Sequence, residues 1–313
     1  MKICLIGSCD LMIDCIKILK KKKIDLLVIL SERHSKSKIV NYKEFPQNIL
    51  KKLKIKYVIS KNINKDIKAK KILKCFNADY GFCFGSAWIF NFEILSMFKN
   101  YQLNFNPTPI PKFFGGAHYT WQILNKNLDS GLFIQEITKN VDRGEIIYIK
   151  KMKIKKKLTK PKDYFQYNYR FQKNVLKKFL TKFLTNKSFK KIPMSKFDSE
   201  REYLPKLNTI KDGFIDWNWH GKDIKTFCDA FDQPYPGAQT IIGKKQVGLQ
   251  TVAFVRKKNI HPFMFGILFR KSQKSIYVFC KGGYLIIKRI INKNKKDINF
   301  DNFKEGQKLI SKK

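Results

Sequence analysis

The sequence predicts an α/β protein in which a Rossmann-like, mostly parallel sheet with flanking helices is followed by a small β-barrel of the oligonucleotide-binding (OB) type. Three observations support this fold class. The first half alternates short apolar runs with segments of helical spacing, the last third consists of short strand-like runs separated by glycines, and the length of 313 residues exceeds one average domain. Because a chain of this size can bury a sizeable core, we expect one large and one small domain.

The N-terminal segment begins with a β-α-β pattern. An apolar run at residues 2–6 is followed by a helical pattern and by a second apolar run at 25–30. The alternation repeats with strand-like runs at 57–59 and 80–84 around a helical stretch at 67–76. This order is typical of a parallel sheet flanked by helices, in which ligands bind beyond the carboxyl ends of the strands.

A change of pattern separates the two predicted domains. Helical periodicity is lost over 191–206, which carries two prolines and mixed charges. We therefore predict a catalytic domain over 1–190, a linker over 191–206 and a C-terminal barrel domain over 207–313. Five strand-like runs follow the linker and favour closure into a barrel: 238–242, 246–254, 265–269, 275–280 and 284–291.

The chain is strongly basic. Lys and Arg total 65 against 24 Asp and Glu, which gives a formal net charge of +41. This charge would attract polyanions such as tRNA, nucleotide-linked substrates or polyglutamylated folate. The positive charge can also be explained without an anionic partner. Lys, Ile, Asn, Phe and Tyr are all abundant, as expected of a genome rich in A and T. Basic residues are densest over 151–196, where a basic surface would favour an anionic partner.

The cysteines and the hydropathy pattern predict a cytoplasmic protein without a metal site. The seven cysteines show neither a CxxC pair nor a Cys/His cluster with zinc spacing. The first apolar run is too short for a signal sequence, and no apolar run reaches the ~18 residues of a membrane helix. We therefore expect reduced thiols and no membrane association.

The most informative segment is 103–116, taken together with 130–131 and 141–147. It resembles the 10-formyltetrahydrofolate-dependent formyltransferases, which include the methionyl-tRNA, sugar-amine and glycinamide ribonucleotide formyltransferases. That family has Asn-x-His and a Pro, then a Gly-rich turn, a helix, a Gly, and Asp-x-Gly before a strand. The runs 212–217 and 234–238 also resemble its C-terminal signatures, so nearly the whole chain is covered. The residues at the matching positions of the first set are Asn104, Pro111, Gly115, Gly131, Asp142 and Gly144.

The resemblance implies the roles of two residues. When an amine attacks a formyl carbon, negative charge develops on the formyl oxygen and positive charge on the nitrogen, so the site needs hydrogen-bond donors and a proton acceptor. By resemblance, Asn104 supplies a donor and Asp142 organises the proton transfers. The plainer alternatives are a turn or cap amide for Asn104 and a turn residue for Asp142.

One position departs from the family. Where the family has its catalytic His, this chain has Asn106, whose amide can donate to an oxyanion but cannot exchange a proton near neutral pH. Loss of an acid–base group typically costs ~10²–10⁴-fold in rate. His118, twelve residues further on, is a candidate to compensate; the alternative is a packing or capping residue.

The resemblance also implies the cofactor, 10-formyltetrahydrofolate as formyl donor. Ser86, Ala87, Trp88 and Ile89 follow the 80–84 run and align with the family's pterin-binding loop, and Asn140 and Val141 would close the opposite wall. A half-apolar pocket with a few polar groups suits a pterin. The alternative is that Trp88 and Ile89 only pack under the sheet edge.

The acceptor amine stays open among three hypotheses. The first is a small amine, foremost an amino sugar on a nucleotide carrier; the second is methionyl-tRNA. The third is a catalytically inactive homologue that binds folate or a nucleotide, with Asn106 marking the lost activity. The segment 108–117 lacks the Ser-Leu-Leu-Pro and Arg-Gly-Ala-Ala-Pro runs usual in the tRNA enzymes, and only 32–38 resembles their basic insertion. These departures favour the small amine.

Overall fold

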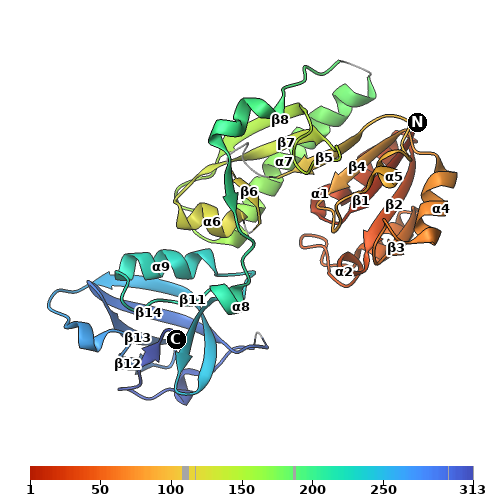
Figure 1. The fold of residues 1–313 in the computed structure, drawn as a ribbon. Helices are drawn as coiled ribbons and strands as arrows, with labels where there is room; N and C mark the ends of the chain where they lie inside the picture. The colour runs from red at the N-terminus through yellow and green to blue at the C-terminus, as the bar shows by residue number, and fades with distance from the viewer. Residues whose placement is uncertain (108–112, 117, 186–187, 295, 313) are drawn as a thin grey trace. The chain divides into compact units, whose positions relative to one another are not determined.

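The computed structural model describes residues 1–107, 113–116, 118–185, 188–294 and 296–312 (Figure 1). Pro111, one of the positions that match the family pattern, lies outside the described residues. The contacts within the chain divide it into two compact units. Unit 1 comprises Met1–Lys112, Asp129–Lys153 and Asn168–Arg201, and unit 2 comprises Phe113–Leu128, Ile154–Tyr167 and Glu202–Lys313.

Unit 1 is built on a seven-stranded sheet with the order β3-β2-β1-β4-β5-β7-β8. The first five strands of this order run parallel, whereas β7 is antiparallel to both β5 and β8. The mostly parallel sheet predicted from the sequence is therefore confirmed. The strands are β1 (Lys2–Gly7), β2 (Asp25–Ser31), β3 (Lys56–Ser60), β4 (Tyr80–Phe84), β5 (Gln102–Asn106), β7 (Asp129–Glu136) and β8 (Ile146–Lys153).

Helices cover both faces of this sheet. One face packs against α1 and the part of α7 from Asn168 onward, and the other packs against α4 and α5. Because both faces are buried, the central strands are almost continuously apolar, which explains the runs seen in the sequence. The helices of this region are α1 (Asp10–Lys21), α2 (Glu32–Ser35), α3 (Pro46–Lys52), α4 (Ile67–Phe76), α5 (Phe92–Leu95) and α7 (Pro161–Leu184).

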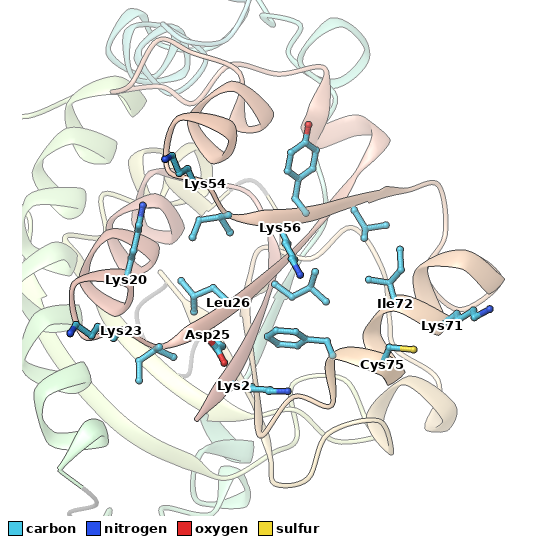
Figure 2. A pocket seen from close by; sticks show the side chains of 16 residues that line it. Lys2, Lys20, Lys23, Asp25, Leu26, Lys54, Lys56, Lys71, Ile72 and Cys75 are labelled. Carbon is cyan, nitrogen blue, oxygen red and sulfur yellow. The ribbon is translucent and has the colours of Figure 1, made fainter.

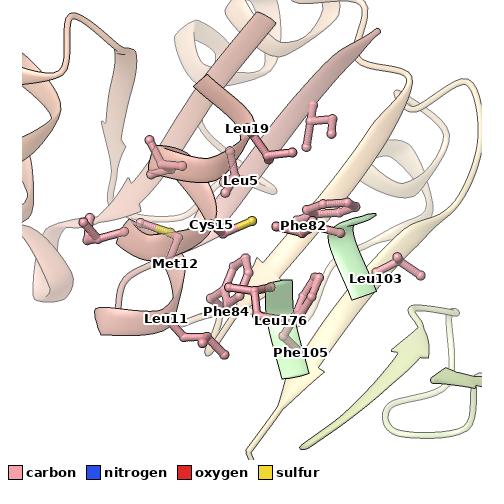
Figure 3. Close-up of a cluster of buried hydrophobic side chains, with 14 of the residues drawn as sticks. Leu5, Leu11, Met12, Cys15, Leu19, Phe82, Phe84, Leu103, Phe105 and Leu176 are labelled. Carbon is pink, nitrogen blue, oxygen red and sulfur yellow. The ribbon is translucent and has the colours of Figure 1, made fainter. Parts of the chain in front are cut away.

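The core cluster beside α1 contains stacked aromatic rings. The rings of Phe84 and Phe105 stack with centroids 4.3 Å apart, and Phe82 and Phe179 lie against Phe105. Figure 3 shows Phe82, Phe84 and Phe105 in this cluster, together with Met12 and Cys15 of α1 and Leu176 of α7. Each such ring buries a large apolar area, so this cluster fixes β4 and β5 side by side.

The order of the strands reverses between β1 and β4, since β2 and β3 lie on one side of β1, and β4 and β5 on the other. Such a switch point opens a crevice at the carboxyl ends of the strands. β1 ends here at Gly7, whose φ is +119°. A Cβ at this position would lie 2.2 Å from the carbonyl oxygen of Phe84, so only glycine allows β1 and β4 to approach so closely.

Unit 2 contains a six-stranded antiparallel sheet with the order β12-β13-β14-β11-β10-β15. An antiparallel bridge between Ile267 and Lys308 joins its two outer strands, and the N–H of Leu309 donates to the carbonyl of Gly266 at 2.8 Å. The sheet thereby closes on itself, which confirms the predicted barrel. The strands are β10 (Ala238–Ile242), β11 (Lys245–Arg256), β12 (Leu268–Ser272), β13 (Ser275–Cys280), β14 (Gly283–Ile291) and β15 (Leu309–Ile310).

The strand predicted over 265–269 is displaced in the structure. β12 begins only at Leu268, because Pro262–Met264 forms a 3₁₀ turn (η2) and Gly266 has a φ of +84°. A bulge between Leu268 and Arg270 then shifts the register against β13.

The remaining elements of unit 2 complete its core. α9 (Gly221–Ala230) packs against β11 and against α6 (His118–Leu124), and β6 (Phe113–Gly115) pairs with β9 (Glu202–Leu204). Trp217, in one of the C-terminal motifs, is buried, and its indole N–H donates to Thr240 Oγ1 at 3.1 Å. Two short helical turns also belong to this unit, α8 (Thr209–Asp212) and η3 (Phe300–Asn302), whereas η1 (Met194–Glu200) belongs to unit 1.

The stretch 191–206, expected to be a linker, contains η1 and β9. The chain passes from unit 1 to unit 2 for the last time between Arg201 and Glu202. None of the helices described is long and apolar enough to cross a bilayer.

Candidate active site

Strand β5 carries both predicted asparagines on one face. Asn104 and Asn106 are two residues apart, so their side chains point to the same side of the sheet. Phe105, between them, points to the opposite side and is buried in the cluster beside α1. Asn104 and Asn106 therefore face the α4/α5 side at the carboxyl end of β5, close to the switch point.

The neighbouring strand β7 adds Gln135, a residue that the sequence analysis did not identify. Gln135 pairs with Asn104 across the antiparallel ladder, so the two side chains share a face. Its side chain is buried, at 2% exposure, and its amide Nε2 donates to Asp142 Oδ1 at 3.0 Å. Gln135 thus connects the strand that bears Asn104 to the predicted proton acceptor. Only the strand register reveals this, since no local motif marks the residue.

Asp142 lies in the loop between β7 and β8 and is half-buried. Its φ is +54°, a left-handed conformation that Asp tolerates better than most residues. Two residues on, a Cβ at Gly144 would lie 1.8 Å from the carbonyl oxygen of Glu136, so the loop is pressed against β7 and requires glycine there. Between them, Arg143 pairs with Asp198 at 2.6 Å. The Asp-x-Gly pattern therefore fixes the loop and presents the carboxylate to Gln135.

One buried polar atom in this cluster lacks a protein partner. Gln135 Oε1 is buried and accepts no hydrogen bond within the described part of the chain. Burying an acceptor unpaired costs ~1–3 kcal/mol, so such an atom is expected where a ligand can supply a donor.

The backbone just after β5 is fixed from α7. Asn168 Nδ2 donates to the carbonyl of Pro107 at 3.2 Å. Gln172 Nε2 donates to the carbonyl of Gly131 at 3.0 Å. Both side chains are buried. They hold the end of β5, and with it Asn106, to the start of β7.

A second buried network lies at the start of α1, at the carboxyl end of β1. Asp14 accepts from the hydroxyls of Tyr42, at 3.0 Å, and Tyr169, at 2.5 Å, and pairs with Lys173 at 3.0 Å. Asp10 accepts from the backbone N–H of Asn41 at 2.7 Å, and burial raises the pKa of its carboxyl. These contacts tie the segment after β2 and the helix α7 to α1.

His118 is the first residue of α6 and belongs to unit 2, whereas Asn104, Asn106 and Asp142 belong to unit 1. Its Nδ1 is buried and has no hydrogen-bond partner among the described residues. Burial lowers the pKa of the His118 imidazole to about 4. The ring is therefore neutral at pH 7, and a pKa so far below neutrality makes it a poor acid–base catalyst there.

The loop 85–91 contains the four residues predicted to bind the pterin. Ser86 Oγ accepts from the N–H of Trp88 at 3.0 Å and donates to its carbonyl at 2.9 Å, which forms a tight turn. The indole N–H of Trp88 donates to the carbonyl of Lys61, and its ring packs against the cluster beside α4. Ala87 and Ile89 are exposed. Trp88 therefore packs under the sheet edge, while Ile89, 68% exposed, does not.

The predicted opposite wall is also exposed. Asn140 lies on the surface, and Val141 is 55% exposed. Ile137, just before this segment, packs against the same cluster as Trp88, so the loops 85–91 and 138–142 border one face of the sheet. The two loops thus present two exposed apolar side chains, Ile89 and Val141, beside polar groups, and this combination suits a flat, partly apolar ring system. The described residues hold no group of three metal-ligating side chains.

Comparison with known proteins identifies similar sequences and similar folds. The chain is 30% identical over 196 residues to the bifunctional polymyxin resistance protein ArnA of Wigglesworthia glossinidia brevipalpis, covering 63% of this chain but only 29% of that protein. It is 21% identical over 310 residues to methionyl-tRNA formyltransferase of Finegoldia magna, covering 97% of this chain and 96% of that enzyme.

The fold also resembles that of WlaRD, a sugar 3N-formyl transferase solved with dTDP and 5-N-formyl-THF. The TM-score is 0.64 at 18% identity, over 95% of this chain and 99% of that one. Residues 1–176 match the formyl transferase family, and residues 209–308 match the formyl transferase C-terminal domain. The chain therefore belongs to the formyl transferase family.

Proposed function

We propose that this protein transfers a formyl group from 10-formyltetrahydrofolate to a primary amine, with an amino sugar on a nucleotide carrier as the leading acceptor. The observation that carries the proposal is that Asn104 and Gln135 are paired on neighbouring strands and that Gln135 donates a 3.0 Å hydrogen bond to Asp142. The acceptor class is supported by the fold of the dTDP-bound sugar formyl transferase and by the absence of the sequence runs usual in the tRNA enzymes.

The folate would lie between the loops 85–91 and 138–142. Ser86, Ala87 and Ile89 would border its ring on one side, and Asn140 and Val141 on the other, with Trp88 supporting the first loop from below. Bound there, the folate supplies the formyl group. The unpaired Gln135 Oε1 fits this proposal, because a ligand amine or ring N–H would satisfy it.

The remaining chemistry falls to side chains of this chain. Asp142 would accept the proton that the amine loses as its nitrogen bonds to the formyl carbon. It would return this proton to the folate nitrogen that leaves when the bond between that nitrogen and the formyl carbon breaks, which releases tetrahydrofolate and the formylated amine. Asn104 and Asn106 donate amide hydrogens toward the formyl oxygen as negative charge develops on it. Asn106 lacks the acid–base capacity of a histidine, so we propose that proton removal depends on Asp142 alone.

The test is transfer of labelled formyl from 10-formyltetrahydrofolate to a panel of nucleotide-linked amino sugars. We expect turnover with at least one sugar, no turnover in Asp142→Asn, and folate binding by Asp142→Asn close to wild type. Asn106→Ala should lose about 2.7–4 kcal/mol of transition-state stabilisation. Full turnover by Asp142→Asn would show that the proposed mechanism is wrong.

Two specific observations favour other functions, and the same assay separates them. The match to methionyl-tRNA formyltransferase over nearly the whole chain favours tRNA as acceptor. This function requires transfer to initiator tRNA and none to the sugars. The asparagine at position 106 favours a folate- or nucleotide-binding homologue without activity. In that case wild type binds folate, transfers to no amine, and gains activity in Asn106→His.

A further inference from the structure

Unit 1 has a pocket at the edge of the sheet opposite the candidate active site. Its volume is about 1160 Å³, and it lies where β1, β2 and β3 begin. Strand β1 has Lys2 at the pocket and Gly7, five residues on, at the switch point. At ~3.3 Å per residue the two ends are about 17 Å apart. This pocket is therefore separate from the proposed folate site.

The pocket is strongly basic. Of its sixteen lining residues six are lysines and one, Asp25, is acidic, whereas about one residue in five of the whole chain is basic. Figure 2 shows Lys20, Lys23 and Lys54 on one side of the pocket, Lys71 on the other, and the Lys56 amine between them. Lys20 is held in place by a bond from its Nζ to the carbonyl of Leu53 at 2.5 Å.

Helix-end stabilisation accounts for few of these lysines. The helices α1, α3 and α4 end at this edge, and lysines in a last turn offset the negative end of the helix dipole. Of the six pocket lysines, however, only Lys20 lies in a last turn. Lys2 and Lys56 begin strands, and Lys23 and Lys54 lie beyond their helices. Helix ends thus account for only part of the pocket's charge. The Nζ of Lys2 lies 5.8 Å from the centre of the Phe76 ring, which also lines the pocket.

We propose that this pocket binds the phosphate backbone of a single-stranded RNA segment. A pocket for a small ligand is enclosed and usually measures ~300–1,000 Å³, whereas this one is larger and its charges are spread over opposite sides. A flat bilayer cannot follow such a hollow. Proteins that bind single strands combine a basic groove with aromatic residues on which bases stack, and Tyr57 and Phe76 line the pocket beside its lysines.

The binding test compares two variants with equal loss of charge. The pocket variant carries Lys23→Asn, Lys54→Asn, Lys56→Gln and Lys71→Gln. The control carries Lys43→Asn, Lys126→Asn, Lys211→Gln and Lys244→Gln, which lie outside both the pocket and the basic stretch 151–196. Asn is chosen because Lys23, Lys54, Lys43 and Lys126 all have φ between 52° and 56°, which Asn tolerates.

Binding of a 12-nucleotide oligouridylate is measured by fluorescence anisotropy between ~50 and ~200 mM salt. We expect the pocket variant to bind about tenfold or more weakly, with a salt slope reduced by ~0.7 per lost phosphate contact, and the control to change less than about threefold. An equal loss of oligouridylate affinity in the pocket variant and the control would overturn the proposal. So would tighter binding of anionic phosphatidylserine vesicles or polyglutamate than of the oligonucleotide by the wild type.

A footprint on the unmodified protein does not depend on the variants folding. Cys75 lines the pocket and is exposed, whereas the other six cysteines are buried or half-buried. Saturating oligouridylate should slow alkylation of Cys75 at least about fivefold, by covering it as the bound backbone fills the groove. An unchanged rate of Cys75 alkylation with RNA bound would place the RNA elsewhere and refute the proposal.

Discussion

Gln135 determines the position of Asp142, and this can be separated from a general stabilising role. Gln135→Met keeps the length of the side chain and removes the 3.0 Å bond to Asp142. We expect kcat for formyl transfer to fall by about 10–100-fold, with a smaller change in KM. The reason is that the Asp142 carboxylate, the proposed proton acceptor, is displaced, whereas substrate binding is retained.

The matched control is Gln102→Met, which removes a buried amide from β5 that bonds to the carbonyl of Leu95. Both variants should lose a similar ~1 kcal/mol in urea unfolding. If both lose activity equally, Gln135 has only a structural role.

His118 should make the stability of the protein depend on pH. Burial lowers the pKa of its imidazole to about 4 in the folded protein, whereas an unfolded chain has a pKa near ~6.5. Between these values the unfolded state binds the additional proton, so stability falls as the pH falls from ~6.5 to ~4. The contribution amounts to roughly 3 kcal/mol at most.

The measurement is urea unfolding at several pH values within this window. His118→Gln, which cannot titrate there, should show a flatter dependence than wild type. An identical slope in the two proteins would mean that other groups cause it.

At the scale of elements, the contact between β4 and β5 depends on aromatic packing. Phe105→Ala would remove a ring that stacks on Phe84 and contacts Phe82 and Phe179, and should cost about 3–5 kcal/mol in the free energy of unfolding. Ile89→Ala, on an exposed side chain, should change stability by less than about 0.5 kcal/mol. Chemical denaturation of both variants measures the difference, and similar losses would contradict the packing argument.

At the scale of the whole molecule, closure of the barrel depends on a few residues near the C-terminus. A chain ending after Lys308 loses β15 and its pairing with β10, which leaves an open sheet edge. We expect a lower melting temperature and aggregation on heating, and light scattering measures the aggregation. A chain ending after Ile310 keeps β15 and should behave as wild type. Equal melting of the two truncated chains would show that closure contributes nothing.

The fold class could be predicted from the sequence alone, as could the residues that resemble the motifs of the family. The central strands are buried on both faces, so β1, β2 and β4 stand out as apolar runs, and α1 and α4 as helical periods. The glycines of the family pattern could be recognised in the sequence because the backbone packs too closely there for any side chain. At Gly144, for example, a Cβ would collide with the carbonyl oxygen of Glu136. Apolar runs, helical periodicity and required glycines each depend on residues close together in the chain, so they can be recognised from the sequence.

Tertiary structure decided what depends on residues that are distant in the chain. The bond between Gln135 and Asp142 follows from strand register and a left-handed turn. The antiparallel pairing of β7 with β5 and β8 has no signal in the local sequence. The low pKa of His118 follows from its burial. The basic pocket collects lysines from positions 2 to 71, and no pattern along the chain shows that they converge. The electrostatic potential of the pocket depends on the positions of these lysines in space, so only the folded chain shows where they converge.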